Sequence, residues 1–173
     1  MKRFIYLGVT MTIVVVSVFF GLRASEVRAK APTIMEFDSM AGVPRPYTGA
    51  TNAIRGINGG GLPWVISAAT GELKQSGDLE VKVTGLVIDP NDPAAITAGL
   101  AGKNPVASFK AIVSCQTVSA GAATVVNVST GLFPATGGGN AKIEAHLDLP
   151  RPCIAPIIFV TSPGGAWFAA TGF

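Results

Sequence analysis

Alternation of apolar and polar residues over short segments limits most strongly what this chain can fold into. In residues 141–149 every second side chain is apolar, and those between are charged or histidine. Residues 79–84 alternate in the same way, with Leu79, Val81 and Val83 on one face. Since successive side chains of a strand point to opposite faces, both segments predict half-buried strands. After the first thirty residues no uninterrupted helical pattern of about twelve residues occurs, so an all-β fold is predicted.

Glycine- and proline-rich turns divide residues 62–173 into about seven strands with short connections. Residues 154–160 are apolar throughout, which predicts a central strand covered on both sides. These features predict a single antiparallel β-sandwich, and a Greek-key or immunoglobulin-like strand order is compatible with them. The strands are expected near residues 64–67, 79–84, 106–117, 124–129, 141–149, 154–160 and 166–173.

Cys115 and Cys153 are the only two cysteines, so a single disulfide connectivity exists. The alternation of its strand points Cys115 toward the core. A bond between the two would close a loop of about 39 residues and stabilise the fold by up to about 4 kcal/mol in the chain-entropy model. A free thiol or a metal site is the alternative, but there is no Cys-x-x-Cys motif and only one histidine. We therefore predict a disulfide and an oxidising compartment.

The first 29 residues resemble an export signal in their composition. Lys2 and Arg3 precede an apolar run over residues 4–22, and Val27 and Ala29 follow as the small residues that a cleavage site needs. The run is long enough either for a signal peptide cleaved after Ala29 or for a retained N-terminal membrane anchor. In both cases the domain is predicted to be secreted or extracytoplasmic, and it meets a membrane only through residues 4–22 if these are retained.

The basic isoelectric point of the chain comes from this leader. From Lys30 onward there are nine basic and nine acidic residues. A domain without net charge has no electrostatic field that attracts nucleic acid, so we do not expect it to bind nucleic acid. The same neutrality favours association, because charge repulsion does not keep copies apart.

Residues 30–61 are rich in proline and glycine and show little periodicity. They are expected to form a strap or linker, with one short edge strand near residues 34–37.

Three aromatic residues are the strongest candidates for a binding patch: Trp64, Trp167 and Phe168. Exposed on a sandwich, they would suit a protein partner or a sugar ring. Buried, they would pack in the core, since each borders an apolar strand.

A weaker candidate is the loop that contains Asp89, Asn91 and Asp92, whose oxygen atoms suit calcium. The loop lacks the glycine and the later glutamate of a twelve-residue calcium loop, and Asp and Asn beside proline are also typical of turns. No cofactor is predicted.

His146 is the only histidine and lies on a polar strand face, as an ordinary surface residue would. The candidate carboxylates for catalysis are expected on separate outward faces: Glu72, Glu80, Glu144 and Asp148. We therefore predict an exported, non-enzymatic protein that binds a protein or glycan partner, or further copies of itself. The alternative is a small extracytoplasmic hydrolase or carbohydrate-active enzyme that uses these carboxylates.

Overall fold

Antiparallel strands are the main secondary structure of the protein, seen in a computed structural model that describes residues 31–171. The leader predicted over residues 1–29 lies outside the described residues. The described residues group as one compact unit. Within the described part, no helix is long and apolar enough to cross a membrane.

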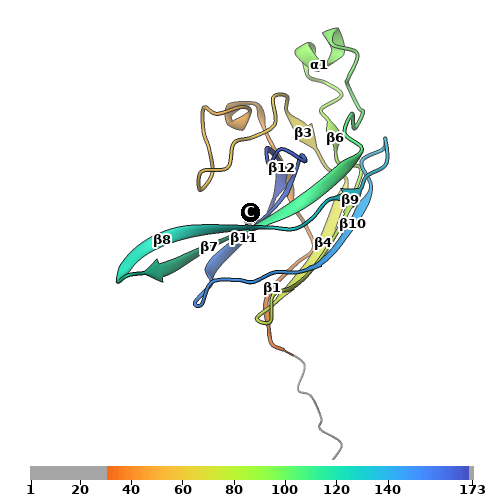
Figure 1. Cartoon of the computed structure of the whole chain (residues 1–173). Coiled ribbons are helices and arrows are strands. Elements are labelled where there is room, and N and C mark those ends of the chain that lie inside the picture. Colours follow the sequence, from red (N-terminus) through yellow and green to blue (C-terminus); the bar gives the residue numbers. More distant parts are fainter. Residues whose placement is uncertain (1–30, 172–173) are drawn as a thin grey trace, which may run out of the picture. The chain divides into compact units, whose positions relative to one another are not determined.

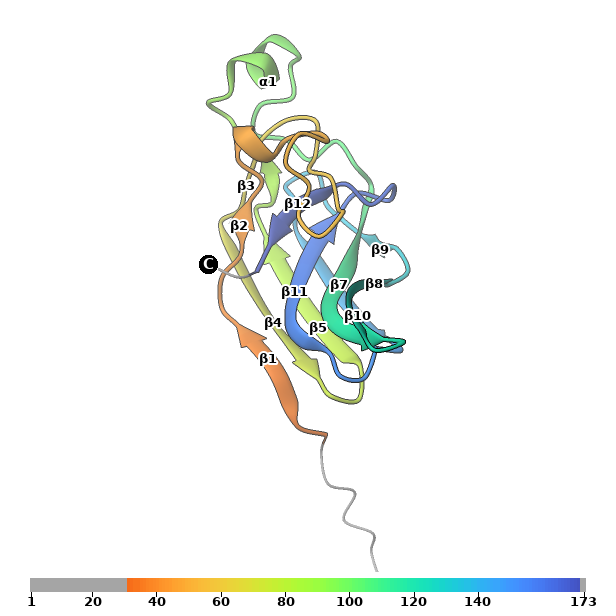
Figure 2. The same cartoon turned by 90° about the vertical axis from the view of Figure 1, so that its left-hand side faces the viewer.

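One sheet has four strands and carries the alternation that the sequence predicts (Figures 1 and 2). Its central strand β5 buries Leu79, Val81 and Val83 and exposes the residues between them. The expected edge strand is present as β1, which pairs with β4 at the sheet margin. In spatial order the sheet contains β1 (Thr33–Phe37), β4 (Ala68–Lys74), β5 (Asp78–Thr84) and β10 (Ala141–His146).

The second sheet has six strands, and its outermost long strand is β8. In spatial order it contains β2 (Ala41–Gly42), β12 (Trp167–Ala170), β11 (Ile154–Thr161), β7 (Ser108–Ser119) and β8 (Ala122–Ser129), with β9 (Phe133–Pro134) also paired to β7. A separate pair joins β3 (Trp64–Val65) to β6 (Val87–Ile88). The helical segments are a 3₁₀ turn at Arg45–Tyr47 and α1 (Pro93–Thr97).

The described residues thus contain twelve strands, more than the seven predicted. Three of the additional strands, β2, β6 and β9, are two residues long, and so is β3, the strand expected near residues 64–67. Such strands are too short to show a period of two, so alternation alone could not reveal them.

A single hydrophobic cluster draws on both sheets. Leu73, Val81 and Ile143 come from the four-stranded sheet, and Phe109 and Val113 come from β7 of the other; each is fully buried. β11 lies in the middle of its sheet, but the expected cover on both sides holds only for its last four residues, since Ile154 and Ala155 are exposed.

Part of the cover over the six-stranded sheet comes from the segment predicted as a linker. Trp167 makes edge contacts with both Phe159 and Tyr47. The backbone of Trp167 also bonds to Asn58 and Gly60.

Of the two expectations for residues 31–61, the packing fits the strap and not the linker, since this segment belongs to the same compact unit as the rest of the domain. This segment supplies β1 to one sheet and β2 to the other. It also contributes three buried apolar side chains to the core, Met40, Val43 and Ile57. Gly42, Gly59 and Gly60 lie where the packing is tight; at Gly59, for example, an added Cβ would lie 2.0 Å from the Tyr47 carbonyl oxygen.

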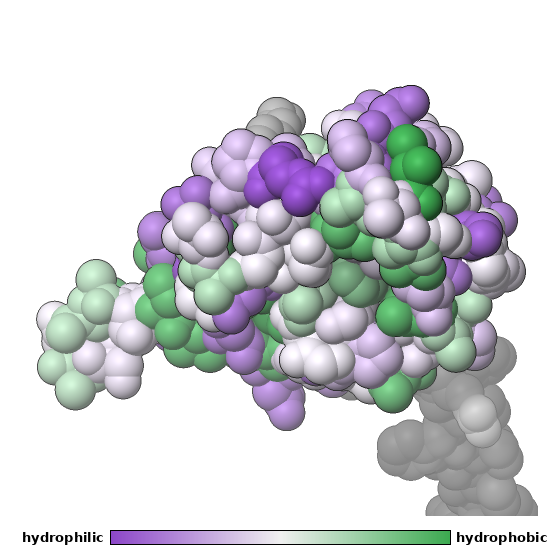
Figure 3. Space-filling model, turned by 90° about the horizontal axis from the view of Figure 1, so that it is seen from above, coloured by the Kyte–Doolittle hydropathy of each residue, from purple (hydrophilic) through white to green (hydrophobic). Residues whose placement is uncertain are grey.

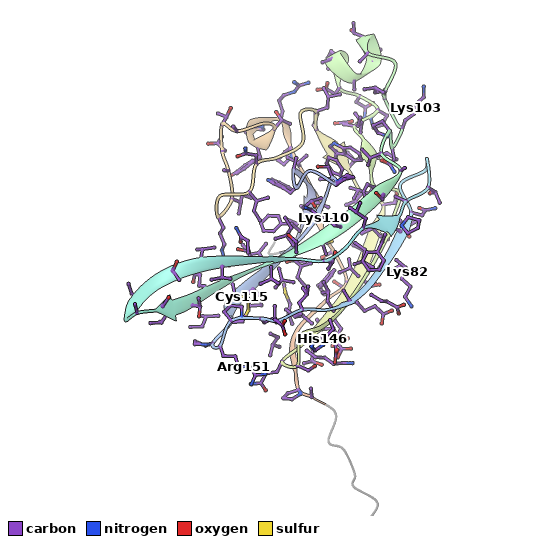
Figure 4. The ribbon with its side chains drawn as sticks, in the orientation of Figure 1. Lys82, Lys103, Lys110, Cys115, His146 and Arg151 are labelled. Atoms are coloured by element: carbon purple, nitrogen blue, oxygen red, sulfur yellow. A yellow bond between two sulfur atoms is a disulfide. The ribbon has the colours of Figure 1, made fainter. Side chains whose placement is uncertain are left out.

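The predicted disulfide between Cys115 and Cys153 is confirmed, with a Cα–Cα distance of 4.9 Å. Cys115 is fully buried on β7, as its alternation predicts. Cys153 immediately precedes β11. The bond therefore links two neighbouring strands of the six-stranded sheet near the point where β7 extends beyond β11 (Figure 4).

Candidate functional site

The aromatic residues predicted as a binding patch are buried, so they do not form an exposed surface. Trp64 and Phe168 are each 5% exposed, and Trp167 is 1% exposed. Trp64 stacks on Phe168 with a ring-centroid distance of 3.8 Å, and both contact the edge of Phe109. These side chains pack in the core, which was the alternative interpretation of the same residues.

The loop considered for calcium serves local structure instead. The Asp89 side chain accepts a hydrogen bond from the Asn91 N–H (2.8 Å), and this bond closes a local turn of the backbone. Asp92 caps α1 by accepting from the Ala95 N–H at 3.0 Å, and its other oxygen pairs with Arg45. Within residues 31–171, no group of three or more His, Cys, Asp or Glu side chains is placed to hold a metal ion.

The four-stranded sheet brings together three of the four candidate carboxylates on one outward face. Glu72 lies directly opposite Glu80, and Glu80 lies directly opposite Glu144. Glu36, on β1, extends the row by facing Glu72. Directly opposed residues have Cβ atoms about 4.5–5.5 Å apart. The expectation that these carboxylates lie on separate faces is therefore wrong. The sequence does not show the register in which the strands pair, and that register aligns the three glutamates. Asp148 alone lies outside the row, beyond the end of β10.

The aligned residues Glu36, Glu72, Glu80 and Glu144 are called the glutamate row below, and two lysines lie beside it. Lys142 bonds Glu144 at 2.6 Å and Glu80 at 3.2 Å. The hydrogen bond that Lys142 donates to Glu144, reinforced by the one to Glu80, raises the pKa of the Lys142 ammonium above its usual value. Glu72 bonds the Thr33 hydroxyl and lies 3.8 Å from the Lys74 ammonium.

A hollow of about 570 Å³ lies over part of the row, lined by Glu36, Asp38, Glu72 and Glu80 among others. The side chains of Glu80 and Glu144 are 55% and 60% exposed, so water solvates them. This arrangement provides paired carboxylates but not the burial that makes a carboxyl group an effective general acid near neutral pH.

His146 lies on the same outward face, as a surface residue (Figure 4). Its Nδ1 is 2.9 Å from Asp78 Oδ1, across the β10–β5 pair. This bond, more than the one from Ser76, lowers the pKa of the Asp78 carboxyl below its usual value. The Ser76 hydroxyl donates to the other oxygen of Asp78 rather than to the histidine, and both cysteines are in the disulfide.

A surface that sequence reasoning missed is the β7–β8 hairpin. Beyond Gln116, β7 pairs only with β8, and the two strands continue outward together; residues 116–125 are called the arm below. In Figure 1 the arm projects to the left, and in Figure 2 it points toward the viewer. Its turn consists of Ala120 and Gly121, both with positive φ (49° and 81°), as a two-residue type I′ hairpin turn requires.

The arm carries exposed apolar side chains and no charge. Val118 is 55% and Val125 41% exposed, and both lie on the same side of the hairpin. Ile154, 50% exposed, continues this surface because β11, β7 and β8 align Ile154, Gln116 and Val125 in one row. The lobe at the left of Figure 3 shows pale and green surface without the deep purple seen elsewhere.

One signal in the sequence could have revealed the arm. No Asp, Glu, Lys, Arg or His occurs between Lys110 and Lys142, a stretch that contains two strands and their turn. A strand pair with one solvated face normally carries charged residues on that face. The strands expected near residues 106–117 and 124–129 left six residues between them, whereas the structure extends both strands to a two-residue turn.

No family model, curated protein or solved structure matches this chain in the three comparisons made. The candidate sites therefore rest on geometry and chemistry alone.

Proposed function

We propose that this protein is a non-enzymatic extracytoplasmic protein that acts by binding, and that the arm is its binding element. The observation that carries the proposal is the exposed, uncharged surface of the arm, with Val118 and Val125 at its centre. Exposed apolar surface on a projecting element costs solubility and is typical of sites that meet a partner. The glutamate row, in contrast, looks like a solvated sheet face with local ion pairs.

The disulfide supports the extracytoplasmic part of the proposal. Cys115 and Cys153 stay paired only where the surroundings are oxidising. A signal peptide or anchor over residues 1–29, which remains a prediction from composition, would deliver the chain there.

We further propose that the two sheets form a β-sandwich with Greek-key connections. The shared hydrophobic cluster supports face-to-face packing. The chain order supports Greek-key crossings: β5 and β10 are neighbours in one sheet although β7 and β8 of the other sheet lie between them in sequence. In this architecture the arm is a rigid extension of one layer, suited to presenting a binding surface.

The test is site-specific photo-crosslinking in the organism that makes the protein. A photo-reactive residue at Val125 is expected to give covalent adducts, identified by mass spectrometry. The matched control is the same residue at Thr84, which is exposed on β5 of the other sheet. Adducts no more abundant at Val125 than at Thr84 would contradict the proposal that the arm binds.

A second candidate function is a carbohydrate-active hydrolase that uses the glutamate row. The opposition of Glu72 and Glu80 favours it, because retaining glycosidases hold two carboxyl groups about 5 Å apart. Hydrolysis of a polysaccharide panel by the exported protein, lost in both Glu72→Gln and Glu80→Gln but kept in Asp148→Asn, would establish this function. Turnover equal to the background rate would exclude it for those substrates.

A further inference from the structure

We propose that β8 of one molecule pairs with β8 of a second copy, antiparallel, so that the two six-stranded sheets join across a two-fold axis. This inference rests on the proposed function, because it names the partner of the arm. Its basis is the unprotected backbone edge of β8, a feature distinct from the apolar side chains that support binding in general.

The four sheet edges differ in how they are protected. β2 has only two residues. β1 is interrupted by a register shift and carries Glu36, and β10 carries Lys142 and Glu144. Short length, irregularity and charge are the devices that keep edges from pairing with other chains. β8 has none of these devices: its eight residues pair with β7 in unbroken register and include neither charge nor proline.

The hydrogen-bonding direction of β8 follows from its pairing with β7. The Thr130 N–H donates to the Ala111 carbonyl at 2.9 Å, so these opposed residues form a hydrogen-bonded pair. Bonded and non-bonded pairs alternate along an antiparallel ladder. The backbone groups of Val126 and Val128 therefore face β7, whereas those of Ala123 and Val125 face the open edge. No other strand of the described chain pairs with that edge.

A second copy fits this edge better than a charged partner. Two antiparallel strands related by a two-fold axis normal to the sheet keep each side chain on its own face, so the central residue lies opposite itself. Centred on Val125, the pairing brings Ala123 opposite Asn127 and sets the N–H and C=O of each Val125 against those of the other. An uncharged strand meets its own copy without repulsion. Arg55, whose backbone carbonyl accepts from the Asn127 amide, directs its guanidinium to the carbonyls of Ser114 and Ala155. The net charge of residues 31–173, with nine acidic and eight basic residues, also opposes self-association little.

The first experiment measures the oligomeric state of the purified, exported protein by sedimentation over a concentration series. The wild type is expected to dimerise reversibly. Val125→Lys places two ammonium groups directly opposite each other and is expected to raise the dimer dissociation constant by about tenfold or more. Val125→Thr, β-branched and uncharged, is expected to dimerise like the wild type.

Val118→Lys is the control that separates edge pairing from association through the apolar side chains. Val118 lies on the same side of the arm but on β7, one strand away from the edge. It is expected to raise the dissociation constant clearly less than Val125→Lys does, because the added charge lies one strand away from the paired edge. Equal loss of dimer in Val118→Lys and Val125→Lys would overturn the β8 pairing in favour of face-to-face contact. Unchanged circular dichroism would confirm that each variant is folded.

Amide hydrogen exchange is a second measurement. It distinguishes backbone pairing at β8 from association through side chains, because only backbone pairing protects the amides at the β8 edge. The Val125 N–H is expected to exchange fast in dilute protein and at least about tenfold more slowly in the dimer. The Val126 N–H, which faces β7, is expected to be protected in both. A Val125 amide with the same exchange rate at all concentrations would contradict the pairing.

The two proposals fail in different ways. If the wild type stays monomeric at millimolar concentration while Val125 still crosslinks to another molecule in cells, self-pairing is wrong and the arm remains a binding element. If neither occurs, both proposals are wrong.

Discussion

Asp92 and Arg45 come from segments 47 residues apart in the chain and meet beside the first turn of α1. Asp92 is 6% exposed, whereas Arg45 is 54% exposed, so the ion pair is half solvated. The cap on Ala95 is the buried part of the arrangement. A helix of five residues has no stability of its own, so this side chain holds the loop that precedes β7.

Replacing Asp92 separates the cap from the ion pair. Asp92→Ala removes both and is expected to lower the free energy of unfolding by about 1–2 kcal/mol, chiefly through the lost cap. Asp92→Asn keeps a capping oxygen and loses the charge, so it is expected to cost less than about 1 kcal/mol, since exposed ion pairs contribute little. Urea denaturation measures both variants. Equal losses would show that the ion pair, not the cap, dominates.

The contact between His146 and Asp78 predicts a titration effect. Because the hydrogen bond from His146 lowers the pKa of Asp78, His146→Ala is expected to raise that pKa toward its ordinary value. The lowered pKa means that the contribution of Asp78 to stability is present above the unfolded pKa of about 3.9 and is lost as pH falls through the folded pKa. NMR titration of the Asp78 carboxyl carbon measures the shift. Ser76→Ala is the matched control and is expected to raise the pKa less, since its bond is the smaller cause.

Among the elements, the arm depends most on one turn. Ala120 adopts a left-handed conformation that is unfavourable for a residue with a Cβ, whereas Gly121 adopts one freely. The two residues nevertheless keep β7 and β8 in register from Ser119 opposite Ala122 to Ile112 opposite Ser129. The length of the arm is therefore decided by strand pairing, with the turn as its weakest point.

Ala120→Asn is expected to stabilise the protein by about 0.5–1 kcal/mol, because Asn tolerates positive φ and Asn-Gly is the preferred pair for this turn. Gly121→Val is expected to destabilise it by about 1–2 kcal/mol through steric strain at positive φ. Thermal unfolding followed by circular dichroism compares them, with Ala122→Asn, in the strand itself, as the control for added polarity. A lower melting temperature for Ala120→Asn would contradict the assignment of the turn.

At the scale of the whole molecule, stability and association have different origins. One core drawn from both sheets stabilises the domain, and the disulfide ties β7 to the start of β11 at the base of the arm. The charged groups concentrate on the outward face of the four-stranded sheet, while β8 at the edge of the other sheet carries none. The charged face is well solvated, whereas the backbone of β8 at the opposite sheet's edge is available to pair with another strand.

Removing the disulfide tests how far the core suffices alone. The double variant Cys115→Ala/Cys153→Ala is expected to keep the wild-type circular dichroism spectrum and to lose about 2–4 kcal/mol of unfolding free energy. The loss arises mainly because the bond restricts the unfolded chain. Wild-type protein unfolded with a reductant is the matched control and should lose a similar amount. Loss of the folded spectrum would show that the core cannot hold the fold without the bond.

The sequence by itself determined the strand type and most inward faces, because alternation is a local property: Leu79, Val81 and Val83 are buried as predicted. It also determined the disulfide, since only two cysteines exist. The tertiary structure decided the register that aligns Glu72, Glu80 and Glu144, and the packing that buries Trp64 and Trp167. It also decided which strand forms an open edge. Those features depend on pairings between residues far apart in the chain, about which the periodicity of one segment carries no information.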